Sequence, residues 1–479
     1  MNRPPLRMLL ILMLLALTPR LALAIAYRQA PIALDDMFQY DMLARSLVGG
    51  NGYRWYQRAD VDMLRPYFES LFDFELPSED VPEEGFVTTF RPPGYPFFLA
   101  GIYALTDLED RFATARIIQS LISALLAPLA ALIAWRLGLP KRAGWWAGIT
   151  VALYPILWMY PIGLASENLF MPLLALSVLG LLWAGEDRRW WAGLLAGLAL
   201  GAATLTRGAL APFLPLAVIW LWRRSGLRAA VILTAATSAV LVPWMVRNSL
   251  ILNKPSFVDN SAGYNLFVGY NPEGDGSFVS EVAVLPMHIL DDGARDQWTR
   301  QQATAFIRQD PGRAAELSLR RLAYFFSFED RELMYFYGNN FFGAIPQPWL
   351  ALAYLILVLP WVAIALSAPF GMASAPGPGR TLILALIAGA LVAYIPILAE
   401  ARFHLPLVPF VAAYAGAAWS APSLGARLHA GLRNRGLAWW LACAAVLILL
   451  ALWAWDLAYG WPRLQALMAP GGNRLWIAY

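Results

Sequence analysis

The stretch WWAGLLAGLALGAATLTRGALAPFLPLAVIWLW, residues 190–222, is apolar apart from a single charged residue, Arg207. A helix needs roughly 20 mostly apolar residues to cross a bilayer, so this stretch predicts two short spans, 190–206 and 208–222. They are either a tilted pair or one helix broken at Arg207. Exposing so much apolar surface to water is unfavourable, whereas exposing it to lipid is not. The stretch therefore predicts a membrane protein.

The rest of the chain has the same character. Of 479 residues, 59% are hydrophobic and 14% are charged, whereas soluble domains are roughly a quarter charged. The net charge of +4 does not indicate nucleic-acid binding, because the basic residues are dispersed in short clusters between apolar runs. Cys443 is the one cysteine, so no intramolecular disulfide can form.

Eleven segments are apolar enough to be candidate spans: 7–27, 113–137, 143–161, 165–184, 190–206, 208–222, 229–247, 349–368, 381–398, 403–420 and 437–458. We therefore expect an all-α polytopic membrane protein with about eleven transmembrane helices. The long connections 28–110 and 248–348 have no apolar run that could cross, and we expect short amphipathic helices within them.

The distribution of Lys and Arg predicts the orientation, because short cytoplasmic loops are enriched in these residues. With the N-terminus (Arg3, Arg7) inside, the other basic clusters fall on the same side: Lys141/Arg142, Arg188/Arg189, Arg223/Arg224/Arg228, Arg380 and Arg427/Arg433/Arg435. Of the 32 acidic residues, only Glu186 and Asp187 lie in these connections. Both long connections are then predicted to lie outside.

The expected organisation follows from these spans. It comprises a first span (1–27), an outer loop with an acidic pair (28–110), spans two to seven (111–247), a large outer loop (248–348), spans eight to eleven (349–459) and an outer tail (460–479). The first segment has an alternative interpretation as a cleaved signal peptide, because two arginines, an apolar stretch and Ala22-Leu23-Ala24 fit that pattern.

The first outer loop opens with LDDMFQYDMLARSLVGG, residues 34–50. Its apolar residues have helical spacing, and Gly49-Gly50 is expected to end the helix. Asp35 and Asp36 lie at its N-terminus, where carboxylates accept free backbone N–H groups and suit the helix dipole. Capping alone would explain the pair without any function.

The second outer loop predicts two further helices, one from about 293 to 309 and one beginning at Asp310-Pro311. The sequence has no phosphate-binding loop, dinucleotide fingerprint or hydrolase elbow. The histidines, His288, His404 and His429, are far apart in sequence, which disfavours a zinc site. A carboxylate site for a divalent cation stays open.

Ionisable groups near membrane depth need a reason, because each costs at least ~2.5–3.5 kcal/mol at the centre of a span. Eight of them are predicted near the outer face: Asp35, Asp36, Arg91, Glu167, Arg207, Arg247, Glu400 and Arg402. Any one of them could be an interfacial side chain or half of a local pair. Together they indicate an outward-facing cavity.

The order of these residues resembles that of the GT-C glycosyltransferase superfamily, and within it the bacterial relatives of protein O-mannosyltransferases and of lipid A aminoarabinose transferase. The matching elements run over about residues 6–420: Asp35-Asp36 with Tyr40, Arg91-Pro92-Pro93, Ser166-Glu167, Thr206-Arg207, Pro243-Trp244 with Arg247-Asn248, Gly269-Tyr270-Asn271-Pro272, and Glu400, Arg402, Phe403 and Pro406. Counting back from Tyr40 aligns the leading aspartate of the family with Asp36, and counting by the acidic pair selects Asp35. We favour Asp36 and keep both.

The resemblance implies a polyprenyl-phosphate-linked sugar as donor, transferred with inversion to a hydroxyl of a protein, lipid or glycan acceptor. It implies Asp36 or Asp35 as the base. It also implies that substrate is bound by Tyr40, Glu167 and Glu400 and by four arginines, Arg91, Arg207, Arg247 and Arg402. No cofactor is required by the pattern, and a divalent cation stays open because family members differ. The expected location is the bacterial cytoplasmic membrane, as a multi-pass protein with its site facing outside.

Three other functions share parts of this pattern. A transporter or flippase of lipid-linked glycans would have the same spans, but it predicts functional groups at both faces. An O-antigen ligase or polymerase predicts its catalytic groups in a large late loop. A scaffold that has lost activity would not need the acidic pair, Arg91 and Arg402.

Overall fold

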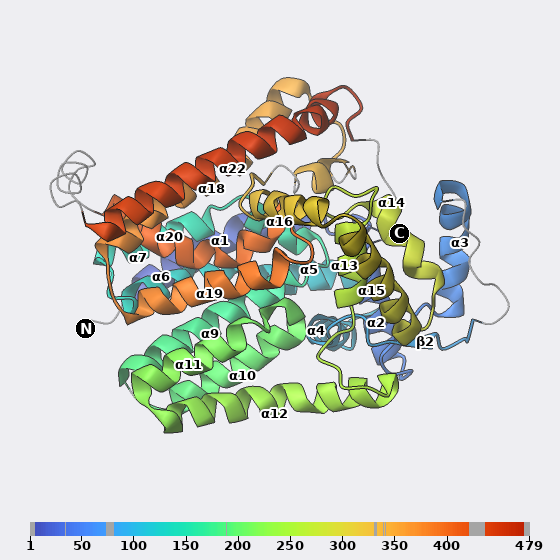
Figure 1. Cartoon of the computed structure of the whole chain (residues 1–479), viewed down its shortest axis with the longest axis horizontal. Helices are drawn as coiled ribbons and strands as arrows, with labels where there is room; N and C mark the ends of the chain where they lie inside the picture. Colours follow the sequence, from blue (N-terminus) through green and yellow to red (C-terminus); the bar gives the residue numbers. More distant parts are fainter. Residues whose placement is uncertain are drawn as a thin grey trace.

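The computed structural model describes residues 5–33, 35–72, 81–187, 189–329, 333–338, 340, 342–420 and 436–473. Within these ranges the chain forms a bundle of helices, with smaller helices of the two long connections gathered at one end (Figure 1). Several basic residues used for the orientation lie outside the described residues, namely Arg3, Arg188, Arg427, Arg433 and Arg435.

Each of the eleven predicted spans contains a helix. Their bounds are α1 (Leu6–Ala26), α5 (Arg111–Ala124) with α6 (Leu126–Arg136), α7 (Lys141–Ala152), α9 (Glu167–Asp187), α10 (Trp190–Thr206), α11 (Phe213–Ser225), α12 (Leu227–Leu252), α18 (Gln347–Ser374), α19 (Pro378–Tyr394), α20 (Val408–Trp419) and α22 (Leu437–Met468). Six of the described helices are long and apolar enough to cross a membrane: α1, α5 continued by α6, α9, α12, α18 and α22. The apolar α10 and α19 are shorter. The expectation of an all-α polytopic membrane protein is confirmed.

Two predicted spans are interrupted. The span 143–161 is α7 followed by a break, α8 (Ile156–Met159) and the 3-10 turn η1 (Tyr160–Ile162), and prolines stand at 155 and 161 where a helical N–H would be missing. The span 403–420 begins as the 3-10 helix η5 (Ala401–Leu407), which contains Pro406. Arg207 has an extended backbone between α10 and η2 (Gly208–Leu210), so residues 190–222 form two separate helices.

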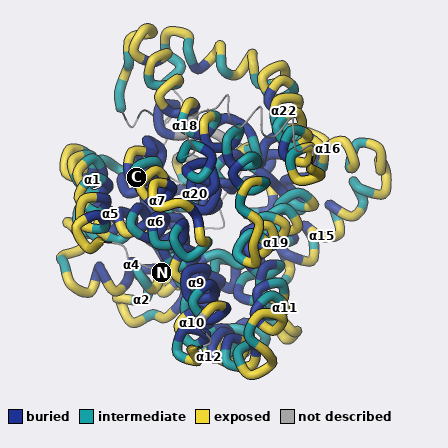
Figure 2. Tube along the Cα trace, turned by 90° about the vertical axis from the view of Figure 1, so that its left-hand side faces the viewer, coloured by how far each residue is buried: buried dark blue, intermediate teal, exposed yellow. Residues whose placement is uncertain are grey.

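Small residues allow the helices to approach closely, as is common in membranes. A Cβ added at Gly197 of α10 would stand 2.6 Å from the Cβ of Ala236 in α12. The first helix is also part of the bundle. It packs against α5 and α7, and its buried Arg20 donates to the carbonyls of Val151 and Ala152. Figure 2 shows α20 and α9 largely buried, while α1 and α22 keep exposed outward sides.

The first long connection forms α2 (Asp36–Val48), α3 (Arg58–Phe72) and α4 (Gly94–Tyr103). It also contains an antiparallel pair of two-residue strands that the sequence did not lead us to expect, β1 (Arg54–Trp55) with β2 (Phe86–Val87), in which Arg54 lies opposite Val87. As predicted, α2 ends at Gly49-Gly50.

The second long connection forms α13 (Ala262–Tyr270), α14 (Ser280–Val284), the 3-10 turn η3 (Leu285–His288), α15 (Asp292–Gln309), α16 (Pro311–Phe325) and the π-helical turn η4 (Met334–Gly338). The two predicted helices are α15 and α16, and Asp310 caps α16 by accepting from the backbone N–H of Arg313 at 2.8 Å. In Figure 1, α13 and α15 lie at the same end of the bundle as α2 and α4.

Candidate active site

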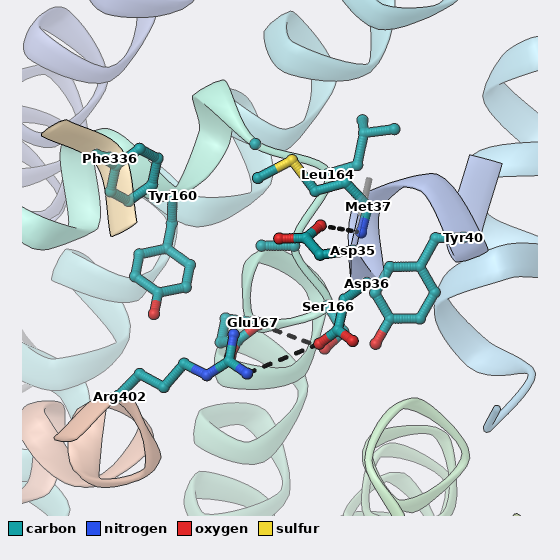
Figure 3. A pocket seen from close by; sticks show the side chains of 12 residues that line it. Asp35, Asp36, Met37, Tyr40, Tyr160, Leu164, Ser166, Glu167, Phe336 and Arg402 are labelled. Atoms are coloured by element: carbon teal, nitrogen blue, oxygen red, sulfur yellow. Dashed lines mark hydrogen bonds and ion pairs between the residues drawn. The ribbon is translucent and has the colours of Figure 1, made fainter. Parts of the chain in front are cut away.

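A pocket of about 420 Å³ opens where the start of α2, the start of α9 and η5 come together (Figure 3). It is lined by Asp35, Asp36, Met37, Tyr40, Tyr160, Gly163, Leu164, Ala165, Ser166, Glu167, Phe336 and Arg402. In Figure 3, Arg402 reaches toward Asp36 from the side opposite Tyr40. Five of the nine predicted site residues therefore line one pocket, although they come from three separate parts of the chain.

Asp36 is the first residue of α2, and its two carboxylate oxygens meet two different arginines. Its Oδ1 accepts a hydrogen bond from Nη2 of Arg91, and its Oδ2 lies 3.7 Å from Nη2 of Arg402. Partial removal from water alone would raise the pKa of Asp36, but the charges of Arg91, Arg402 and Arg207 together lower it below its usual value. The side chain keeps 38% of its surface exposed, so substrate can reach it.

Asp35 has a different local role. Its Oδ1 accepts from the backbone N–H of Met37 at 2.8 Å, which makes Asp35 the N-cap of α2. The capping interpretation of the acidic pair thus describes Asp35, while Asp36 takes part in the charge cluster.

A second ion pair stands beside the first. Glu167, the first residue of α9, pairs through Oε1 with Nη1 of Arg207, and both side chains are largely buried. Arg207 also lies 3.4 Å from the hydroxyl of Ser166. The extended backbone that interrupts the helices at Arg207 brings its guanidinium to the end of the bundle where α9 begins.

Arg402 is held less tightly than the other arginines of the cluster. Its Nε lies 3.3 Å from Oε2 of Glu400, but none of the described residues accepts a hydrogen bond from that nitrogen. Glu400 also accepts from the backbone N–H of Phe278 at 3.3 Å, which joins η5 to the second long connection.

Arg91 and Tyr40 complete the cluster. Arg91 donates through Nε to Oε1 of Gln39 at 2.7 Å, in addition to its contact with Asp36. Its guanidinium carbon lies 5.7 Å from the centre of the Tyr40 ring. Arg91 thus contacts three residues of α2, each at the pocket or next to it.

Arg247 is not brought to this pocket. Its hydrogen bonds go to the carbonyl of Thr88 at 2.7 Å and to Oδ1 of Asn248 at 2.9 Å, and its guanidinium lies 4.5 Å from the Trp244 ring centre. Arg247 therefore supports the backbone three residues before Arg91.

The sequence reasoning missed two polar residues that shape the pocket. Gln39 supports Arg91, and its place three residues after Asp36 on α2 could have indicated this. Arg116, inside an apolar run, is fully buried and donates to the carbonyls of Arg28, Ala30 and Ile162 at 2.6–2.8 Å. A charge in an apolar run was the available signal for Arg116.

In the part of the chain that the structure describes, no group of three or more His, Cys, Asp or Glu side chains forms a metal-binding cluster.

Residues 90–246 match the family model described as dolichyl-phosphate-mannose-protein mannosyltransferase. This range contains Arg91, Glu167 and Arg207. Across 99% of the chain, the fold is similar to that of the Archaeoglobus fulgidus oligosaccharyltransferase solved with a tethered acceptor peptide, with a TM-score of 0.50 and 14% identity. The sequence is thus similar to this mannosyltransferase family over residues 90–246, and the whole chain has a fold similar to that of the oligosaccharyltransferase.

The chain covers 56% of the length of that oligosaccharyltransferase, so it spans little more than half of it. It is also similar to ArnT from Cupriavidus metallidurans bound to undecaprenyl phosphate, with a TM-score of 0.48 and 15% identity over 95% of this chain and 73% of ArnT. No curated protein matches the sequence significantly.

Proposed function

We propose that this protein transfers a sugar from a polyprenyl-phosphate donor to an acceptor hydroxyl, with inversion at the anomeric carbon, and that Asp36 is the base. The observation that carries this proposal is the pairing of one carboxylate with two arginines at the edge of a pocket. Such a site offers a proton acceptor next to cations suited to a phosphate.

The reaction needs one proton transfer and one displacement. Asp36 takes the proton of the acceptor hydroxyl while its oxygen bonds to the anomeric carbon of the sugar. The bond between that carbon and the phosphate oxygen breaks, and the lipid phosphate leaves with the electron pair. A positioned base contributes about 10²–10⁴-fold to such a step.

The arginines stabilise the charge that develops on the leaving phosphate, which is usually the largest contribution to catalysis. Arg402 is best placed for this role, because its side chain lines the pocket and its Nη2 lies 3.7 Å from Oδ2 of Asp36. Arg91 is the second phosphate ligand. Glu167 and Glu400 orient Arg207 and Arg402, and Tyr40 forms the wall beside Asp36.

The pocket is proposed to face outside the bacterial cytoplasmic membrane. Glu167 begins α9 and Arg207 follows α10, so the site lies at one end of these helices. Basic residues stand at the other end of the bundle: Lys141 begins α7, Arg223 lies in the last turn of α11, and Arg380 lies in the first turn of α19. Since basic loops favour the cytoplasm, the opposite end is expected outside.

The proposed donor class is supported by the family model that matches residues 90–246, whose description names dolichyl-phosphate mannose. We extend it to polyprenyl-phosphate sugars, with a protein, a lipid or another glycan as acceptor.

The test is sugar transfer or release from a panel of radiolabelled polyprenyl-phosphate sugars by the purified protein. Asp36→Asn should lose about 10²–10⁴-fold in kcat with unchanged thermal stability in detergent. The matched control is Asp62→Asn on α3, whose side chain is 61% exposed and pairs with Arg65.

The Asp62 variant should retain wild-type activity. If the folded wild-type protein releases sugar from no donor, the transferase proposal is wrong, and a transporter or scaffold becomes the better explanation. If wild type and Asp36→Asn are equally active, transfer occurs but Asp36 is not the base.

A further inference from the structure

A buried acid–base pair lies in the same part of the fold as the pocket, outside the charge cluster. Glu329, between α16 and η4, and His404, in η5, are both fully buried, and Nε2 of His404 lies 3.4 Å from Oε1 of Glu329. The hydroxyl of Tyr154 also donates to Oε1 of Glu329. Buried ionisable groups are costly unless they are paired and hydrogen-bonded.

The hydrogen bonds of His404 restrict where its protons lie. Nδ1 of His404 is 2.9 Å from the carbonyl oxygen of Phe325, and because a carbonyl only accepts, Nδ1 carries a proton. Nε2 then meets Glu329 in one of two ways. Either His404 is a cation facing a carboxylate, or Nε2 is bare and Glu329 supplies the proton. In both cases the two residues share one proton, and the pair has no net charge.

Among the described residues, Glu329 has few hydrogen-bond partners besides His404 and Tyr154. Its Oε2 has no hydrogen-bond partner among the described residues. Burial raises the pKa of the Glu329 carboxyl, and His404 and Tyr154 only partly oppose that rise. On the other side of His404, the ring of Trp361 from α18 stacks at 3.8 Å between ring centres. The imidazole is therefore held at its two ring nitrogens and by stacking on one face.

Each partner of Glu329 belongs to a segment that forms a wall of the pocket. His404 stands two residues after Arg402 in η5, and Arg402 reaches Asp36. Tyr154 stands six residues before Tyr160, which lines the pocket. Glu329 thus joins two walls that are about 250 positions apart in sequence.

We propose that Glu329 and His404 are positioning residues that hold η5 so that Arg402 is placed against Asp36 and the donor phosphate. This role rests on the proposed transferase function. A displacement of about 1 Å at a reacting group can cost about 10²-fold in rate, so loss of the pair is expected to lower turnover without touching any substrate.

The test compares Glu329→Ala with Glu329→Gln. The glutamine amide offers both an oxygen and an N–H group, so it keeps a hydrogen bond to Nε2 in either protonation state. We expect Glu329→Ala to lower kcat/KM by about 10²-fold, and Glu329→Gln to lower it far less, because the hydrogen bond to Nε2 is kept. The matched control is Glu316→Gln on α16, an exposed glutamate paired with Arg320.

The same substitutions in an Arg402→Lys background separate positioning from general stability. If Glu329 acts through Arg402, Glu329→Ala should have little further effect on kcat/KM there, because interacting residues are not additive. An equal loss in both backgrounds, or full activity of Glu329→Ala in the otherwise wild-type protein, would overturn the proposal. In either case an active wild type leaves the transferase function standing, whereas an inactive wild type refutes that function and this role together.

Discussion

Arg91 and Asp36, 55 positions apart in the sequence, form a hydrogen-bonded ion pair at the edge of the pocket, and Arg402 approaches the other oxygen of the same carboxylate. The charge of the ionised Asp36 carboxylate is thus balanced by two arginines before any donor binds. A donor phosphate would compete for the same guanidinium groups and leave the carboxylate more basic. The pair therefore couples donor binding to the strength of the proposed base.

This coupling predicts a pH effect. The arginines lower the pKa of Asp36 in the free protein, so Asp36 stays ionised to lower pH than an ordinary aspartate. Because the base must be deprotonated, the acid limb of kcat/KM is expected below the usual aspartate range near about 3.9. Arg91→Gln removes one of these charges, and the limb should move to higher pH.

The measurement is a pH–rate profile of kcat/KM for wild type and Arg91→Gln with one donor. A limb at the same pH in both proteins would show that Arg91 does not influence the base. The acid limb of kcat should lie at higher pH than that of kcat/KM, because kcat reports the complex with bound phosphate.

Gly94 is predicted to be intolerant of a side chain. It follows the Arg91-Pro92-Pro93 segment, and a Cβ there would stand 2.7 Å from Oγ1 of Thr206 and 2.9 Å from the backbone of Leu205. Gly94→Ala should cost about 1–3 kcal/mol and lower activity, because Arg91 and Arg207 flank the contact. Thermal unfolding in detergent measures the first effect.

The same helix supplies the control for that substitution. A Cβ added at Gly101 of α4 would have no atom within 4 Å, so Gly101→Ala should leave the melting temperature unchanged or raise it. Equal melting temperatures of the Gly94→Ala and wild-type proteins would show that α4 and the end of α10 can separate without loss.

The helical architecture was predictable because a long apolar run in a membrane has few conformations other than a helix that satisfy its backbone hydrogen bonds. The interruptions were harder to predict. Pro155 lies within an apolar run that reads as one span, and only packing decides whether a membrane helix bends or breaks at a proline. The strand pair of Arg54 with Val87 joins residues over 30 positions apart and has no local signal.

Part of the charge cluster was also predictable from the sequence. A charged residue next to a span is visible in the sequence, which is how Glu167, Arg207 and Arg402 were found, whereas Arg91 was found through its resemblance to a family motif. What the sequence does not contain is the pairing: nothing local distinguishes Arg402, which approaches Asp36, from Arg247, which binds backbone carbonyls. Pairing depends on contacts between distant segments.

Arg116 is expected to position the acidic pair. Its guanidinium joins the carbonyls of Arg28 and Ala30, which precede Asp35, to that of Ile162, which precedes the pocket residue Gly163. Arg116→Gln would leave buried carbonyls unsatisfied, at about 1–3 kcal/mol each. We expect a lower melting temperature and reduced transfer, whereas Arg142→Gln, at the exposed start of α7, should change neither. A wild-type melting temperature for Arg116→Gln would contradict this role.

The two adjacent aspartates are expected to respond differently to the same substitution. Asp35 caps α2 through the N–H of Met37, and asparagine caps a helix about as well as aspartate does. Asp35→Asn should therefore keep stability and most activity, while Asp35→Ala should lose about 1 kcal/mol. Asp36→Asn keeps the fold but removes the charge that faces Arg91. Sugar transfer measured for the three variants side by side distinguishes the roles, and an inactive Asp35→Asn beside an active Asp36→Asn would reverse the assignment, because Asp35 also lines the pocket.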